Sequence, residues 1–117
     1  MGLFQWFERI SENNQRSPIR RPPEDGAPVV RRRFRFTGRV QGVGFRYEAC
    51  LIAGELSLTG WARNESDGTV TVEAQGPDAC VREFVRVMES VPRFRITEIQ
   101  SEERPVSGEE TGFRILY

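Results

Sequence analysis

Three glycines within residues 38–46, together with the arginine at position 46, are the residues of this sequence best suited to chemistry. The stretch reads Gly38-Arg39-Val40-Gln41-Gly42-Val43-Gly44-Phe45-Arg46. Glycine adopts left-handed backbone conformations at little cost, so such a loop can turn several N–H groups toward one point. If a helix follows, its first N–H groups and its positive dipole end add to that point. Arg46 would add a guanidinium suited to binding two phosphate oxygens, so the pattern indicates an anion-binding loop.

Asn64 is the second candidate residue, eighteen positions after Arg46. An uncharged carboxamide can accept a hydrogen bond from a water and hold that water toward an electrophile. Beside a cation and a row of backbone donors, it could support phosphoryl transfer through positioning and electrostatics, without a covalent intermediate.

The composition excludes several other kinds of catalysis. All seventeen basic residues are Arg, and the sequence has no Lys and no His. Lysine Schiff bases, histidine acid/base catalysis and histidine metal ligands are therefore ruled out. Cys50 and Cys80 have no Cys-x-x-Cys spacing, which favours two thiols in a reducing cytoplasm over a disulfide.

The 117 residues suffice for one domain with a core, and their charge is unevenly divided. Residues 1–33 hold seven Arg against four acidic residues, and the remainder holds ten Arg against thirteen. A mildly acidic body argues against a nucleic-acid partner. No apolar run approaches the roughly eighteen residues that span a bilayer. We expect a cytoplasmic protein without membrane insertion.

Residues 1–30 are predicted to be a disordered N-terminal extension, and residues 31–117 the folded domain. Residues 3–12 could form a short amphipathic helix, because their apolar residues recur at helical spacing. Residues 11–28 are polar and rich in proline, which indicates a linker. We therefore expect that removing residues 1–30 leaves activity unchanged. The run Arg31-Arg32-Arg33 is interpreted as the solvated start of a strand.

The pattern after residue 30 predicts an α+β, ferredoxin-like βαββαβ sandwich. Its antiparallel sheet would carry two helices on one face and a short extra C-terminal strand. Strands are predicted at residues 33–37, 58–64, 69–74, 93–103 and 112–117, and helices at 47–56 and from Pro77 onward. A phase slip before Ile99 predicts a bulge. In this order of elements the end of strand 58–64 can lie near the start of the first helix, so Arg46 and Asn64 can meet.

Two motifs in the right order make the chain similar to the acylphosphatase family. They are residues 38–46 and the stretch Gly60-Trp61-Ala62-Arg63-Asn64-Glu65-Ser66-Asp67-Gly68-Thr69-Val70, and the resemblance runs from about Arg32 to Tyr117. It implies hydrolysis of the carboxyl–phosphate anhydride of a small acyl phosphate by a monomer, with no metal and no cofactor. Arg46 would bind the substrate phosphate, and Asn64 would orient the hydrolytic water. The phosphate oxygens would be held by backbone amides of Gln41, Gly42, Val43, Gly44, Phe45 and Arg46.

The sequence departs from the family pattern at Ser57, Leu116 and Ala62, the last of which replaces a usual Val. Ser57 stands where the family has glycine, which costs about 1 kcal/mol if the position needs positive φ. Leu116 stands where Arg is common.

A non-catalytic anion-binding module is the alternative function, which Asn64 disfavours because binding alone needs no water-orienting amide. An RNA-binding domain shares the fold, but Val43 replaces the aromatic residue on which a base would stack.

Overall fold

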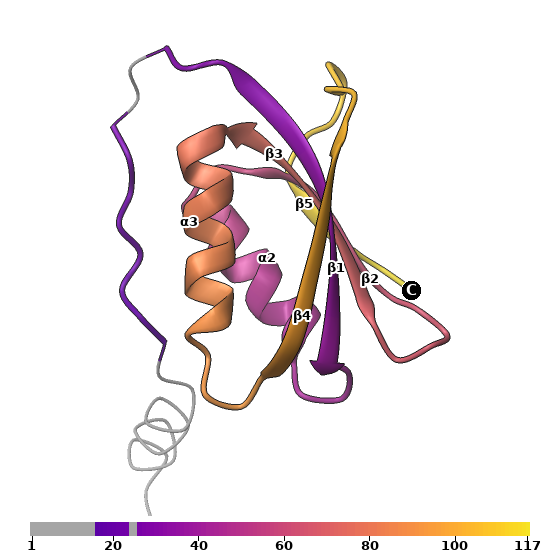
Figure 1. Ribbon diagram of the computed structural model, residues 1–117. Coiled ribbons are helices and arrows are strands. Elements are labelled where there is room, and N and C mark those ends of the chain that lie inside the picture. The colour runs from indigo at the N-terminus through magenta and orange to yellow at the C-terminus, as the bar shows by residue number, and fades with distance from the viewer. Residues whose placement is uncertain (1–15, 24–25) are drawn as a thin grey trace, which may run out of the picture.

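The computed structural model describes residues 16–23 and 26–117. Its elements are, in chain order, β1 (Val29–Arg39), α2 (Phe45–Glu55), β2 (Thr59–Asn64), β3 (Val70–Pro77), α3 (Asp78–Glu89), β4 (Arg95–Arg104) and β5 (Phe113–Leu116). The five strands form one sheet in the order β4-β1-β3-β2-β5. Both helices lie on the same face of this sheet (Figure 1). In the part of the chain that the structure describes, no helix is long and apolar enough to cross a membrane.

The core lies between the helices and the sheet, and the spacing of apolar residues explains it. Phe34 and Phe36 alternate along β1 and are buried, as expected of a strand with one covered face. Along α2 the buried residues recur at helical spacing and bring Phe45 against the sheet. The Phe45 ring packs 4.9 Å from that of Phe36 and 4.8 Å from that of Phe94, measured between centroids. The first turn of α2 is therefore fixed by aromatic packing.

The predicted βαββαβ fold with an extra C-terminal strand is confirmed. The first four strands pair antiparallel, and β5 pairs with β2 in parallel, so the sheet as a whole is mixed. The bulge is confirmed as well. Thr37 of β1 pairs with Glu98 and Gly38 with Ile96, which leaves Thr97 as the extra residue on β4.

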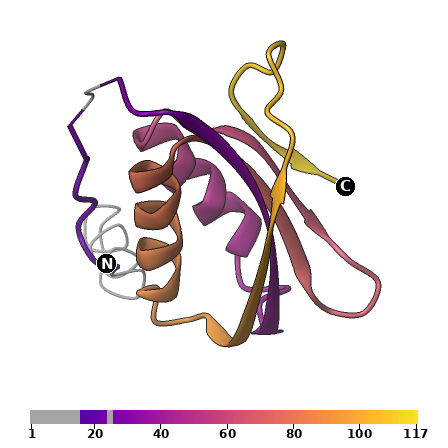
Figure 2. The same cartoon turned by 45° about the horizontal axis from the view of Figure 1, so that its top comes forward.

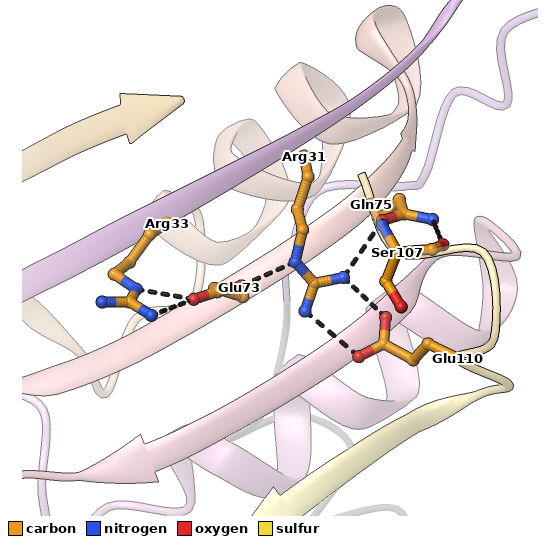
Figure 3. Close-up of polar contacts among 6 residues, drawn as sticks. All are labelled: Arg31, Arg33, Glu73, Gln75, Ser107 and Glu110. Carbon is orange, nitrogen blue, oxygen red and sulfur yellow. Dashed lines mark hydrogen bonds and ion pairs between the residues drawn. The ribbon is translucent and has the colours of Figure 1, made fainter. Parts of the chain in front are cut away.

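The face of the sheet away from the helices carries ion pairs, and one expectation about it is wrong. Arg31 is not solvated at the start of a strand, since only 7% of it is exposed. Its guanidinium donates to the carboxylates of Glu73 and Glu110, which lie on β3 and in the loop before β5 (Figure 3). Arg33 also pairs with Glu73. The carboxylates of Glu73 and Glu110 are largely buried here because each is paired with a guanidinium.

The segment 16–23 runs along α3, on the side of that helix away from the sheet (Figures 1 and 2). The Ser17 amide donates to Ser90 Oγ at 2.8 Å, and the Arg20 amide donates to Glu83 Oε2 at 2.5 Å. Arg86 donates to the Pro18 carbonyl. These bonds hold the segment on α3, although the composition of residues 11–28 alone indicates a linker. The helix predicted at residues 3–12 lies outside the described residues.

Candidate active site

The anion loop, residues 40–44, joins β1 to α2 and leaves several backbone donors at the start of the helix. Gly42 and Gly44 adopt left-handed conformations, with φ of 74° and 76°, and both are exposed. A side chain would be strained at either position, which accounts for the two glycines. The first intrahelical bond runs from the Glu48 amide to the Gly44 carbonyl at 3.0 Å. The amides of residues 45–47 precede it and have no helical partner.

The first backbone donors of α2 have no side-chain cap among the residues that the structure describes. Gly44 is the N-cap residue of α2, and within the described chain no side chain makes a capping hydrogen bond there. The Phe45 ring is buried in the core, so this residue offers only its backbone to a ligand. The start of α2 thus combines unpaired N–H groups with the positive end of the helix dipole, which suits an anion.

Arg46 lies in the first turn of α2 and reaches across to the end of β5. Its Nη1 donates to the Leu116 carbonyl at 3.3 Å, and its guanidinium carbon lies 5.0 Å from the centroid of the Tyr117 ring. The main chain of Leu116 makes the hydrogen bond, so the side-chain departure at this position leaves it intact. The carbonyl and the aromatic ring restrict where the guanidinium can sit.

Asn64 is the last residue of β2, one position beyond the residue that pairs with Leu116. Leu116, which accepts from Arg46, pairs with Arg63, the residue before Asn64. Successive side chains alternate between faces, so Asn64 shares a face with Ala62, which is fully buried under α2. The carboxamide and the guanidinium therefore belong to the same end and the same face of the sheet, as the order of elements predicts.

Gln41 ties the anion loop to the strand that carries Asn64. Its Nε2 donates to the carbonyls of Glu65 at 2.7 Å and Thr69 at 2.9 Å, on either side of the β2–β3 turn. Both neighbours of Asn64 are therefore connected to this region. Glu65, after it, is bonded to Gln41 of the loop, and Arg63, before it, pairs with Leu116 of β5, whose carbonyl binds Arg46. These bonds link the loop and the first turn of α2 to the backbone around Asn64. The sequence predicted that Arg46 and Asn64 can meet, but it did not predict these bonds.

The acidic and thiol groups nearby are engaged or buried. Glu65 follows Asn64 but binds Arg63 at 2.8 Å, and this hydrogen bond lowers the pKa of its carboxyl group. Cys50 lies further along α2, where burial raises the pKa of its thiol, and no disulfide joins it to Cys80. Within residues 16–23 and 26–117, no three His, Cys, Asp or Glu side chains gather where they could hold a metal ion. The arrangement is suited to binding an anion and orienting a neutral water.

Sequence reasoning did not identify Arg93 and Glu48, which support the anion loop and the first turn of α2. Arg93, between α3 and β4, donates through Nε to the Val43 carbonyl at 2.6 Å and through Nη2 to Glu48 Oε1 at 3.1 Å. Glu48 is fully buried in the first turn of α2. One signal was available, because position 48 falls on the apolar stripe of the helix. A carboxylate on such a stripe requires a cationic partner.

Comparison with known proteins places the chain in a family. The Acylphosphatase family model matches residues 32–115. The acylphosphatase of Geobacillus thermodenitrificans is 44% identical over 81 residues, which cover 68% of this chain and 86% of that protein. The acylphosphatase of Arthrobacter sp. strain FB24 is 44% identical over 94 residues, covering 80% and 86%. The crystal structure of acylphosphatase from Bacillus subtilis superposes with a TM-score of 0.70 at 35% identity, over 75% of this chain and 99% of that one.

The chain belongs to the acylphosphatase family. The expectation of an enzyme of this family is thereby confirmed, and so is its fold. Residues 1–31 precede the matched region, so the segment that lies along α3 is outside the part shared with the family model.

Proposed function

We propose that the protein hydrolyses acyl phosphates to a carboxylate and inorganic phosphate. The observation that carries the proposal is the bond from Arg46, in the first turn of α2, to the carbonyl of Leu116. Leu116 pairs with Arg63, the residue before Asn64, and this supports a site shared by the guanidinium and the carboxamide. Family membership supports the same reaction. The roles assigned to Arg46, Asn64 and the backbone amides of residues 41–46 are part of this proposal.

In the proposed reaction, water attacks phosphorus and the bond from phosphorus to the acyl oxygen breaks. An acyl phosphate dianion and one water give a carboxylate and dihydrogen phosphate, so atoms and charge balance. Arg46 and the loop amides stabilise the charge on the phosphoryl oxygens, and Asn64 accepts a hydrogen bond from the attacking water. The carboxylate is a good leaving group, so positioning and electrostatics supply the catalysis.

One assay with two variants tests these roles. Arg46→Gln should lower kcat/KM for acetyl phosphate by at least about a hundredfold, since it removes a charge aimed at the phosphoryl group. Asn64→Ala should lower kcat to a similar degree while inhibition by inorganic phosphate stays within about twofold, because Asn64 acts on water. Arg39→Gln, which removes an exposed arginine from the same motif, is the control and should retain activity.

The outcomes separate catalysis from mere binding. Phosphate binding without turnover in the wild-type protein would make it the anion-binding module considered as the alternative. Loss of phosphate inhibition in Asn64→Ala would make Asn64 a ligand contact instead. The same assay run with a chelator tests the proposed independence from metal ions. Light scattering of the wild-type protein tests the proposed monomeric state. A cytoplasmic location remains a proposal.

A further inference from the structure

Arg93 forms a hydrogen bond with the peptide group between Val43 and Gly44. The Nε of Arg93 donates to the Val43 carbonyl at 2.6 Å, and its Nη2 lies 3.2 Å from where a Cβ on Gly44 would stand. In a trans peptide the C=O and the following N–H point in opposite directions. Fixing the Val43 carbonyl on Arg93 therefore aims the Gly44 N–H away from Arg93. A hydrogen bond to a cation also polarises the peptide and strengthens the N–H as a donor.

The guanidinium of Arg93 is itself fixed on two further sides. It stacks over the Phe94 ring at 5.0 Å, and Phe94 packs on Phe45 at the start of α2. Its Nη2 bonds to Glu48 Oε1 at 3.1 Å. The Glu48 amide in turn donates to the Gly44 carbonyl. Loop, helix and guanidinium thus form a closed ring of contacts around Gly44.

Glu48 brings a second arginine into this arrangement. Its carboxylate is fully buried, and a buried negative charge beside an anion-binding loop would oppose both folding and phosphate binding unless cations offset it. Arg93 lies against Oε1, and Arg16 approaches Oε2 with its Nε at 3.6 Å. Arg16 belongs to the segment along α3, where the Ser17 amide is bonded to Ser90, three residues before Arg93.

We propose that Arg93 is a positioning residue for the anion loop, and that Arg16 of the N-terminal segment supports it by sharing the charge of Glu48. Arg93 directs the Gly44 amide toward the bound phosphate without touching the substrate. This inference rests on the proposed function in that residues 41–46 bind phosphate. It replaces the expectation that residues 1–30 have no effect on activity.

The test measures phosphate binding in the full-length chain by calorimetry, beside kcat and KM for acetyl phosphate. Arg93→Gln should weaken phosphate binding and raise KM by about tenfold, the loss expected for one charge-assisted contact, with a smaller change in kcat. Arg93→Lys should not restore affinity, because one ammonium group does not reproduce the planar fork that reaches Val43 and Glu48 together. Arg16→Gln should weaken binding by about threefold, since its contact with Glu48 is longer than that of Arg93, at 3.6 Å against 3.1 Å.

Two further variants separate loop positioning from charge balance. The double variant Arg93→Gln/Glu48→Gln removes both charges, so it should regain stability yet keep the weakened phosphate binding. Arg82→Gln removes an exposed arginine of α3 that pairs with Asp78, and it should bind phosphate like the wild type. Wild-type affinity in the double variant, or in Arg93→Gln, would overturn the proposal. Phosphate binding by a wild-type protein without turnover contradicts the proposed function alone, and absence of binding contradicts both.

Discussion

Ser57 holds a backbone conformation that is costly for any residue with a side chain. Its φ is 55°, and it is the one residue other than glycine with positive φ in the described chain. Ser57→Gly should raise the free energy of unfolding by about 0.5–1 kcal/mol, because glycine adopts this conformation without strain but orders at a greater entropic cost. Urea denaturation measures the change, and acetyl phosphate turnover should be unaltered.

The control for this prediction lies in the β2–β3 turn. Ser66 is an exposed serine whose φ is not positive, so Ser66→Gly should leave stability unchanged or lower it. Equal effects of the two substitutions would show that backbone strain at Ser57 contributes nothing. The hydrogen bond from Arg21 to Ser57 Oγ is exposed, and its loss subtracts little from the gain.

At the residue scale, the sequence indicated the proposed ligand-binding residues more readily than the residues that support them. Arg46 and Asn64 stand in motifs whose residue types are themselves chemical signals. Arg93 and Glu48 are forty-five positions apart and come into contact only when the connection between α3 and β4 packs against the start of α2. No local pattern encodes such a pair. The carboxylate on the apolar stripe of α2 signals that a cation is needed, but not which of the seventeen arginines supplies it.

At the scale of elements, Glu83 fastens the segment 16–23 to α3. Its carboxylate accepts from Arg86 and from the Arg20 amide, and these bonds lower its pKa from 4.5 to about 2. A carboxyl group with a depressed folded pKa stabilises the fold above its unfolded pKa, and this contribution disappears as the pH falls through the folded value. The contribution of Glu83 is therefore complete above about pH 4.5 and fades toward pH 2.

Glu83→Gln should lower stability at pH 7 by about 1 kcal/mol, through loss of the charge in both hydrogen bonds. The difference from wild type should shrink between pH 4.5 and pH 2, as measured by thermal unfolding. Hydrogen exchange at the Arg20 amide should become faster. Glu89→Gln changes an exposed carboxylate on the same helix and serves as the control. A difference that stays constant with pH would show that charge at Glu83 does not hold the segment.

Prediction of whole elements succeeded where side chains repeat regularly and failed where contacts come from distant parts of the chain. The phase slip before Ile99 reported the bulge, because one extra residue inverts the alternation of Phe94, Ile96 and Ile99. The parallel pairing of β5 with β2 was not specified, since four residues carry too short a pattern to select a partner. The docking of residues 16–23 depends on Glu83, Arg86 and Ser90, and so required the structure of α3.

At the scale of the whole molecule, the cluster around Arg31 joins three parts of the chain on the open face of the sheet (Figure 3). Arg31 and Glu73 lie on neighbouring strands, whereas Glu110 belongs to the loop that leads from β4 to β5. Gln75 fastens the same loop through the amide and the carbonyl of Ser107. Because β5 carries the carbonyl that holds Arg46, this cluster connects the open face to the candidate site on the other side of the sheet.

Arg31→Gln should therefore lower the free energy of unfolding by about 3 kcal/mol, since it removes the cation paired with Glu110 and leaves the largely buried Glu73 with Arg33 alone. Arg35→Gln is the matched control on the same strand and face. Arg35 pairs with Asp67 in solvent, so its loss should cost less than about 1 kcal/mol. Urea denaturation at pH 7 compares the two, and hydrogen exchange along β5 should accelerate only in Arg31→Gln. Equal losses would mean that the cluster adds no more than surface charges do, and that β5 is held to the sheet by its pairing with β2 alone.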